Sequence, residues 1–409
     1  MRYVSTRGQA PVLNFEGAML SGLARDGGLY LPETIPAFGG LNDLDGLPYE
    51  EVAFRVIRPF TGDSFTDAEL RGAIDRAYGR IEHTAKAPLR QLAPGHHLLE
   101  LFHGPTLAFK DFAMQLIAQL FEIALRRSGQ RITIVGATSG DTGSAAIEAF
   151  KGIDNVDVFI MFPHGRVSEV QRRQMTTPDA ANVHALAVTG HFDDCQARLK
   201  DLFNDHAFRD NVGLAGVNSI NWARVVAQIV YYFTATASLG MRETDFTVPT
   251  GNFGDIFAGS MARAMGLPIR RLIVATNQND ILHRALTTGE YRVGTVEPSI
   301  SPSMDIQVSS NFERALYLAY GGDAAAISQL MDELKAGGFT ISQGALPSSR
   351  TVPPASRAAL KGLASAGFAR VQPAGGSSRA TPKLMSPAVV IAGSIPSEAA
   401  SRRARSLAP

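Results

Sequence analysis

Apolar residues along this chain follow two different spacings, and each spacing predicts a different kind of structure. In the first 80 residues they recur at helical intervals, and segments 49–60 and 67–78 are predicted helices. Farther along, short apolar runs of strand length alternate with helical stretches. The predicted strands are 131–135, 156–161, 182–188, 246–248 and 271–275. Strands that alternate with helices predict an α/β fold, in which helices cover both faces of a mostly parallel sheet.

These patterns divide the chain into three parts. Residues 1–80 are predicted to form a small, mainly helical N-terminal domain, and residues 81–352 form a larger α/β domain. The last part, 353–409, has no sustained apolar period, and its only aromatic residue is Phe368. From Pro354 onward the formal charge is +7, whereas the preceding 353 residues carry −6. We predict a disordered basic tail. Its bias toward Ala, Arg, Pro and Ser is typical of a GC-rich gene translated out of frame, and binding of an anionic surface is the alternative.

Composition limits the class of protein further. The 409 residues carry a formal net charge of +1, so the charge gives no indication of a nucleic-acid or membrane partner. The single cysteine, Cys195, excludes a disulfide within the chain and fits a reducing compartment. No signal peptide and no apolar segment of about twenty residues is present. We expect a cytoplasmic protein. We also expect no metal site, because His83, His96 and His97 have no partner at metal-ligand spacing.

One lysine has unusual neighbours in a chain with seven lysines and thirty-two arginines. Lys110 lies in the segment 106–112, between Phe109 and Phe112. Apolar surroundings favour the neutral amine, and a neutral amine can condense with an aldehyde. The alternative is a lysine whose stem covers apolar surface while its charge remains in water.

A polar, glycine-rich loop, 136–143, follows the predicted strand 131–135 and opens a helix. Thr138, Ser139 and Thr142 place hydroxyl groups at the helix N-terminus, where the helix dipole favours an anion. This loop suits a carboxylate or a phosphate. The alternative is an ordinary turn with a threonine cap.

A second loop, 248–255, also leads from a strand to a helix. Gly251 and Gly254 allow backbone conformations that other residues avoid. The amides from Asn252 to Asp255 can therefore converge on a phosphate. The loop contains no lysine or arginine, so amides and the helix dipole would hold the anion.

In this order, the Lys110 segment and the two loops resemble the fold-type II pyridoxal-phosphate enzymes, the class that includes the tryptophan synthase β subunit. Within that class the chain is similar to the threonine synthases of the longer bacterial and fungal kind. Further segments carry the same resemblance: 5–8, 22–30, 103–106, 171–176 and 217–224. The resemblance covers residues 1 to about 352. It implies a threonine-synthase N-terminal domain over 1–80 and a catalytic domain of two subdomains over 81–352.

The resemblance also implies a role for each candidate residue. For the cofactor, pyridoxal 5′-phosphate, Lys110 is expected to form the Schiff base and to move protons. Asp141 is expected near the cofactor's 3′-oxygen. The cradle for the cofactor phosphate is expected from Gly251, Asn252, Phe253, Gly254 and Asp255.

For the substrate, the resemblance implies two anion sites. Thr138, Ser139 and Thr142 are expected to hold the α-carboxylate. The substrate phosphate is expected to bind Asn218, Ser219 and Arg224, because a guanidinium can hold it with two hydrogen bonds.

The implied reaction converts O-phospho-L-homoserine and water to L-threonine and phosphate. Two alternatives remain open at this point. One is a phospho-lyase of the same branch that releases 2-oxobutyrate and ammonia. The other is a catalytically silent relative, since nothing in 353–409 matches the family segment that bonds the cofactor's pyridine nitrogen.

Overall fold

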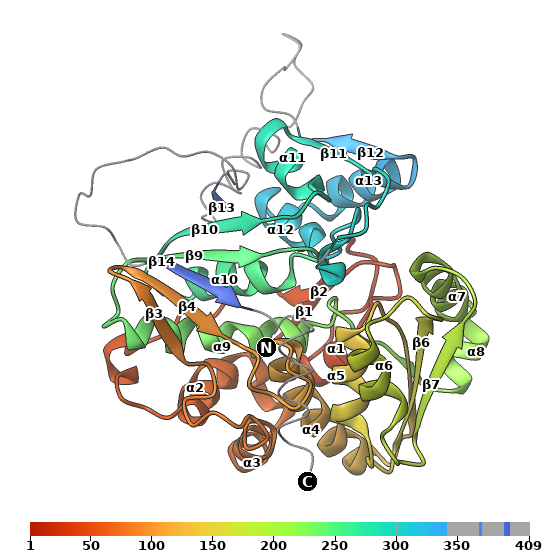
Figure 1. Ribbon diagram of the computed structural model, residues 1–409, viewed down its shortest axis with the longest axis horizontal. Coiled ribbons are helices and arrows are strands. Elements are labelled where there is room, and N and C mark those ends of the chain that lie inside the picture. The colour runs from red at the N-terminus through yellow and green to blue at the C-terminus, as the bar shows by residue number, and fades with distance from the viewer. Residues whose placement is uncertain (300, 342–367, 370–387, 393–409) are drawn as a thin grey trace.

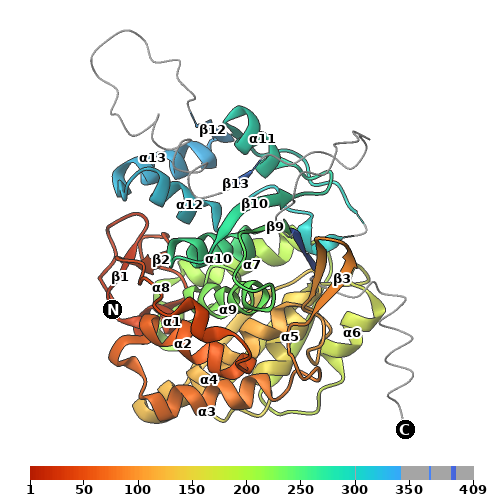
Figure 2. The same cartoon turned by 90° about the vertical axis from the view of Figure 1, so that its left-hand side faces the viewer.

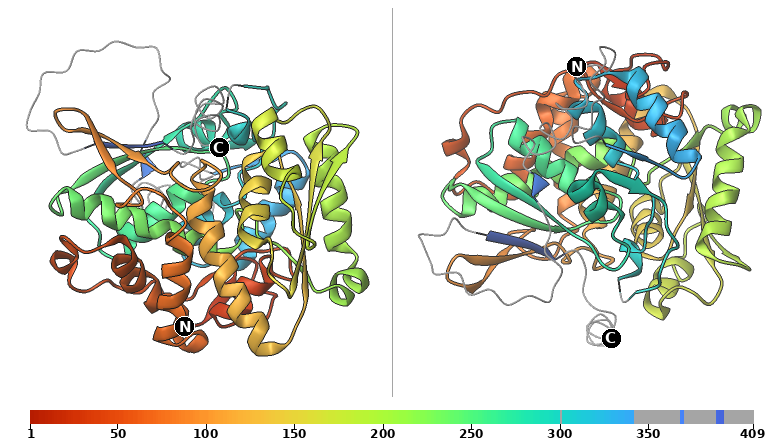
Figure 3. Two further views of the ribbon diagram at one scale, coloured as in Figure 1. Left: turned by 60° about the horizontal axis from the view of Figure 1, so that its bottom comes forward. Right: turned by 90° about the horizontal axis from the view of Figure 1, so that it is seen from above.

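The structure, a computed structural model, describes residues 1–299, 301–341, 368–369 and 388–392. Two β-sheets lie side by side, with helices around both of them (Figure 1). The views from below and from above show the small sheet standing beside the large one (Figure 3). The predicted α/β architecture is therefore confirmed, with the parallel strands distributed over two sheets.

The N-terminal part is mainly helical, as predicted. Its two longest helices are α2 (Tyr49–Thr61) and α3 (Asp67–Tyr78), which match the predicted segments. The Thr66 side chain caps α3, and Glu69 returns a hydrogen bond to the Thr66 amide, which completes a capping box. The sequence did not predict the antiparallel pair β1–β2, whose strands are only three residues long. The remaining elements of this part are β1 (Tyr3–Ser5), α1 (Phe15–Ser21), β2 (Tyr30–Pro32), η1 (Leu41–Leu44) and η2 (Gly62–Ser64).

The small sheet is fully parallel and has the strand order β7-β6-β5-β8. Its strands are β5 (Ile132–Ala137), β6 (Val156–Pro163), β7 (Val183–Val188) and β8 (Leu214–Ala215). The first three correspond to predicted strands. The helices associated with it are α4 (Lys110–Ser128), α5 (Asp141–Phe150), α6 (Glu169–Thr176), α7 (Phe192–Asn204) and α8 (His206–Asn211).

The large sheet has six strands in the order β13-β10-β9-β14-β4-β3. All neighbours are parallel except the hairpin β3–β4 at one edge. Its strands are β3 (Leu89–Ala93), β4 (His96–Glu100), β9 (Thr244–Pro249), β10 (Ile269–Ala275), β13 (Phe368–Ala369) and β14 (Ala388–Ala392). The other elements of this half are α9 (Trp222–Ser238), α10 (Gly254–Ala264), α11 (Ile281–Thr288), β11 (Glu290–Arg292), η3 (Pro302–Met304), α12 (Phe312–Ala319), α13 (Ala324–Lys335) and β12 (Gly338–Thr340).

Two pieces of the basic tail belong to this large sheet. Strand β14 lies between β4 and β9, with Val389 fully buried and Ile391 2% exposed. The prediction of a disordered tail is therefore corrected for 368–369 and 388–392, while the rest of 353–409 lies outside the described residues. The mean composition of the tail concealed a short run of β-branched residues, and such a run fits a strand between two partners.

Helix α9 connects the parts of the molecule. It is buried along most of its length and packs on α10, α4 and α2. Helix α3 packs on α4, so the N-terminal helices cover one side of this helical layer (Figure 2). No helix within the described ranges combines the length and the apolar content needed to cross a bilayer.

Candidate active site

A cavity of about 1010 Å³ lies between the two sheets, at the carboxyl ends of β5, β9 and β14. Most of its wall comes from segments 106–110, 135–139, 141–143, 217–219, 249–255 and 301–306. Every candidate residue named from the sequence lines this cavity. The packing of the two sheets thus brings together candidate residues that are up to 145 positions apart, from Lys110 to Asp255.

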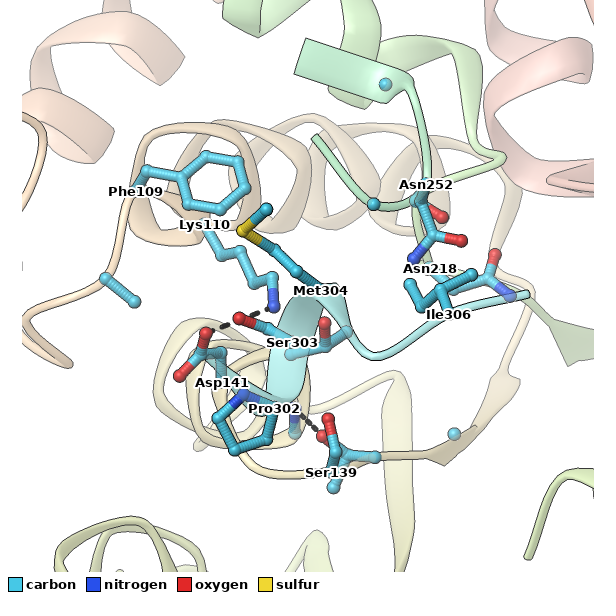
Figure 4. Close-up of a pocket in the computed structure, with 18 of the residues that line it drawn as sticks. Phe109, Lys110, Ser139, Asp141, Asn218, Asn252, Pro302, Ser303, Met304 and Ile306 are labelled. Carbon is cyan, nitrogen blue, oxygen red and sulfur yellow. Dashed lines mark hydrogen bonds and ion pairs between the residues drawn. The ribbon is translucent and has the colours of Figure 1, made fainter. Parts of the chain in front are cut away.

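Lys110 is the first residue of α4, and its side chain is 12% exposed. Its Nζ atom lies 3.4 Å from the Oδ2 atom of Asp141 and 5.7 Å from the centre of the Phe109 ring (Figure 4). Burial lowers the pKa of the Lys110 amine; the Asp141 carboxylate opposes this shift, and the Arg224 charge adds to it. The amine is therefore closer to its neutral, reactive form than a lysine in water.

The turn before Lys110 is held by Asp111, which sequence reasoning missed. The Asp111 carboxylate accepts hydrogen bonds of 2.8 Å from both the amide and the hydroxyl of Thr106. Burial raises the pKa of Asp111 to about 7. Leu107 within this turn has φ +61°, a left-handed conformation that costs energy for a branched side chain. A Cβ on Gly104 would lie 2.5 Å from Asp111, so the turn needs glycine there.

Asp141 is the first residue of α5 and remains ionised. Burial would raise the pKa of Asp141, but the Lys110 charge and hydrogen bonds from Ser303, Lys110 and Gln171 outweigh it and lower that pKa. The Gln171 amide donates to Asp141 Oδ1 at 2.5 Å. Gln171 was noted in the sequence only as part of a matching segment, and Ser303 of η3 was not noted, because neither is near Asp141 in the chain.

In the first glycine loop, the Thr138 hydroxyl oxygen forms hydrogen bonds within the loop itself. It accepts hydrogen bonds from the amides of Gly140 and Gly143, at 2.9 and 3.0 Å. Thr138 therefore shapes the loop. Ser139 and Thr142 are half-buried in the cavity wall, at the N-terminus of α5.

The second glycine loop leads into the N-terminus of α10. Phe253, the residue before the helix, is buried and has φ +66°. The Asn252 carbonyl accepts from Asn311, and the Gly251 carbonyl accepts from the Ser309 hydroxyl at 2.5 Å. These carbonyls are directed toward α12, and the first amides of α10 make this helix N-terminus a candidate anion site.

The prediction for the second glycine loop concerned its backbone amides, and the Asp255 side chain has a separate role. Its carboxylate accepts hydrogen bonds from the hydroxyls of Tyr231 and Tyr232 on α9, at 2.5 and 3.0 Å. Burial raises the pKa of Asp255 to about 6 against the opposing effect of these two bonds. The carboxylate thus anchors the loop to α9, and only the Asp255 backbone can contribute to a phosphate cradle.

Arg224 is a buried guanidinium at the cavity wall. Within the described ranges it forms no ion pair, its Nε atom has no hydrogen-bond partner, and its Nη1 atom lies 3.5 Å from the Val217 carbonyl. Burial lowers the pKa of Arg224 to about 10. The Asn218 Oδ1 atom is buried without a partner as well. An unpaired buried cation is costly, so this arrangement indicates a site completed by an anion.

These features fit pyridoxal phosphate. Its aldehyde requires an amine such as that of Lys110, and its phosphate requires amide donors such as those at the start of α10. In the part of the chain that the structure describes, no cluster of His, Cys, Asp and Glu could hold a metal ion.

Family comparisons agree with this assignment. The model described as "Pyridoxal-phosphate dependent enzyme" matches residues 83–331, and the one described as "Threonine synthase N terminus" matches residues 2–78. The fold and the cavity therefore define a fold-type II pyridoxal-phosphate enzyme. More narrowly, the chain belongs to the threonine synthase family, as its relatives show.

Threonine synthase from Pseudomonas aeruginosa is 58% identical over 343 residues, which cover 83% of this chain and 73% of that protein. The Saccharomyces cerevisiae enzyme is 45% identical over 367 residues, covering 82% of this chain and 71% of its own. Among solved structures, pyridoxal-phosphate-bound threonine synthase from Brucella melitensis superposes with a TM-score of 0.84 at 50% identity, covering 97% of this chain and 89% of that one. Yeast threonine synthase gives 0.81 at 42% identity, covering 90% and 76%.

Proposed function

We propose that this chain converts O-phospho-L-homoserine and water to L-threonine and phosphate. The observation that carries the proposal is the presence of two buried basic side chains, Lys110 and Arg224, in one cavity. Lys110 supplies an amine of lowered pKa, and Arg224 supplies a guanidinium that forms no ion pair within the described residues. A reaction at the carbon skeleton of a phosphorylated amino acid requires both kinds of group.

The cofactor would be held by residues from both sheets. The amides at the start of α10, in the loop Gly251–Asp255, would bind its phosphate, and Lys110 would bind its aldehyde carbon. Asp141, whose Oδ2 atom lies 3.4 Å from the Lys110 Nζ atom, would lie near the cofactor's 3′-oxygen. When bound, pyridoxal phosphate supplies the electron sink that makes carbanion character at the substrate's Cα and Cβ accessible.

Lys110 would then move the protons. Its Nζ atom, released from the cofactor by the substrate, would take a proton from Cα and transfer protons at Cβ. A lowered pKa suits this role near neutral pH. The ionised Asp141 would stabilise the ammonium form between transfers, because opposite charges this close favour the charged state.

Substrate orientation would come from two anion sites. The hydroxyls of Ser139 and Thr142, at the N-terminus of α5, would hold the α-carboxylate. Arg224, with Asn218 and Ser219, would hold the phosphate that leaves from Cγ. Binding the substrate at both ends would align its Cα–H bond with Lys110 and exclude water from the cavity around it.

The test is product identification with purified full-length protein, pyridoxal phosphate and O-phospho-L-homoserine. We expect L-threonine and phosphate in equal amounts. Release of 2-oxobutyrate and ammonia would favour the phospho-lyase. A protein that binds the cofactor without releasing phosphate would favour the silent relative, and both results would contradict the proposal.

We also propose that the protein acts in the cytoplasm. Its single cysteine, Cys195, is buried and free, which suits a reducing compartment. Cell fractionation with an antibody to the chain tests this location, and recovery in an exported fraction would contradict it.

A further inference from the structure

The first turn of α12 lies against both proposed ligand loops. Asn311 and Arg314 are one helical turn apart, so their side chains lie on the same face of α12. Both are fully buried, and neither has a role in the reaction as proposed above. In this subsection the cofactor loop is 251–255 and the substrate loop is 218–221.

The Asn311 side chain joins these two loops directly. Its Nδ2 atom donates to the Ser219 carbonyl at 2.9 Å and to the Asn252 carbonyl at 3.2 Å. Its backbone amide also donates to the Asn252 carbonyl, at 3.0 Å. A side-chain amide has two hydrogens in a fixed plane, so it can serve both carbonyls only while their separation is constant.

These bonds also orient the cofactor loop. The Asn252 carbonyl and the Phe253 N–H belong to one planar trans peptide, so holding the carbonyl at Asn311 directs the N–H to the opposite side. Phe253 has φ +66°, which a non-glycine residue adopts only when its surroundings impose it. Ser309 adds a second tie, because its hydroxyl donates to the Gly251 carbonyl at 2.5 Å.

Arg314 extends the connection to the N-terminal domain. Its Nε and Nη2 atoms donate to the Tyr30 carbonyl at 3.0 and 2.8 Å, and Nη2 also donates to the Ile220 carbonyl at 2.5 Å. Its Nη1 atom donates to Asn311 Oδ1, which fixes the orientation of that amide. The neighbouring Glu313 pairs with Arg7 at 3.1 Å, so the N-terminal domain holds α12 at two points.

We propose that Asn311 is a positioning residue that fixes the cofactor loop relative to the substrate loop, and that Arg314 anchors the substrate loop to the N-terminal domain. This rests on the proposed function of the two loops. No residue of 1–80 lines the cavity, so the N-terminal domain can influence the reaction only through contacts of this kind. The N-terminal domain of the family thereby acquires a defined role, which is to set the distance between the site for the cofactor phosphate and the site for the substrate phosphate.

Three variants test the contacts to the cofactor loop and to the substrate loop separately. Asn311→Asp replaces the shared donor with an oxygen that the two carbonyls repel. Ser309→Ala releases only the cofactor loop, and Arg314→Lys removes the guanidinium that joins the Ile220 carbonyl of the substrate loop to the Tyr30 carbonyl. The matched control is Asn182→Asp. The Asn182 amide likewise donates to backbone carbonyls, three of them at 3.0, 3.2 and 2.9 Å, and Asn182 does not line the cavity.

Three measurements follow for each variant. Titration of apo-protein with pyridoxal phosphate gives the cofactor dissociation constant, steady-state kinetics give KM for O-phospho-L-homoserine, and ³¹P NMR reports on the bound cofactor phosphate. We expect Asn311→Asp to raise both constants about tenfold, the order expected for one or two lost hydrogen bonds. Ser309→Ala should raise only the cofactor constant. Arg314→Lys should raise KM by a larger factor than the cofactor constant, because Arg314 contacts the substrate loop directly and the cofactor loop only through Asn311. The ³¹P shift should change in Asn311→Asp and Ser309→Ala.

The proposal is overturned if Asn311→Asp matches Asn182→Asp in both constants, or if Ser309→Ala and Arg314→Lys affect the two constants alike. If Asn311→Asp does not fold, the contrast between the other two variants decides the question. If the proposed function itself is wrong, the measurements give a different result. The unaltered protein would then bind pyridoxal phosphate without forming threonine, and the cofactor constants and ³¹P shifts would still test Asn311 and Ser309.

Discussion

The Nζ atom of Lys110 lies 3.4 Å from the Oδ2 atom of Asp141, and both side chains are almost enclosed. The contact joins the first residues of α4 and α5, which come from separate strand–helix units. Burial and the Arg224 charge lower the pKa of Lys110, and among the causes of the shift only the Asp141 carboxylate raises it. This dependence makes the pair a direct test of the proton-transfer role.

Asp141→Asn should change the pH profile as well as the rate. Removing the carboxylate removes the effect that raises the pKa of Lys110, so that pKa falls further. The acidic limb of the kcat profile should move to lower pH, and kcat should fall by about tenfold or more. Asp157→Asn, which removes an exposed ion pair with Arg131, is the control. An acidic limb that stays in place would show that Asp141 does not govern the amine.

Arg224→Lys should weaken substrate binding specifically. Lysine keeps the positive charge but cannot hold a phosphate with two parallel hydrogen bonds. We expect KM for O-phospho-L-homoserine to rise about thirtyfold, with a smaller change in kcat, measured by phosphate release. Arg131→Lys, at an exposed ion pair, should leave KM unchanged. An unchanged KM in Arg224→Lys would move the substrate phosphate to another part of the cavity.

Asp255→Asn should alter how stability depends on pH. Burial raises the pKa of Asp255 to about 6 in the folded protein, above the ordinary value of 3.8. The stabilisation linked to this proton is complete below about pH 4 and is lost as the pH rises through 6. The variant lacks this loss, so its stability relative to the unaltered protein should rise between pH 4 and 7, by up to roughly 3 kcal/mol. Thermal unfolding across this range measures the difference, and parallel curves would contradict the assignment.

Val389→Asp tests whether β14 belongs in the large sheet. Val389 is fully buried between β4 and β9, so an aspartate there would place an unpaired charge in the core. We expect a loss of at least about 3 kcal/mol in the free energy of unfolding. The neighbouring Val390 is 38% exposed, and Val390→Asp is the matched control. Equal unfolding temperatures for the two variants would mean that the strand does not occupy this position.

Much of the site could be predicted because its chemistry lies in short contiguous segments. Lys110 was recognised from its phenylalanine neighbours, and the two loops from glycines placed between a strand and a helix. Segments of this kind are governed by local rules, since a strand, a tight turn and a helix N-terminus use neighbouring residues. The helices 49–60 and 67–78 were predictable for the same reason.

Partners across the fold could not be predicted in this way. The sequence predicted a role for the Asp255 amide but none for its side chain, which the packing of α10 on α9 places beside Tyr231 and Tyr232. The average composition of the tail concealed β14, whose place depends on two strands far away in the chain. Asn311 gave no sequence signal, because it acts through carbonyls of two loops that become its neighbours only on folding.

The sequence by itself determined the α/β class, the family resemblance and the segments that carry the chemistry. Only the tertiary structure decided which of these groups meet: the amine beside Asp141, the unpaired guanidinium of Arg224, and the amide of Asn311 between two loops. The reason is physical. Local conformation follows from adjacent residues, whereas burial, pKa and hydrogen-bond partners depend on the packing of elements that are remote in the sequence.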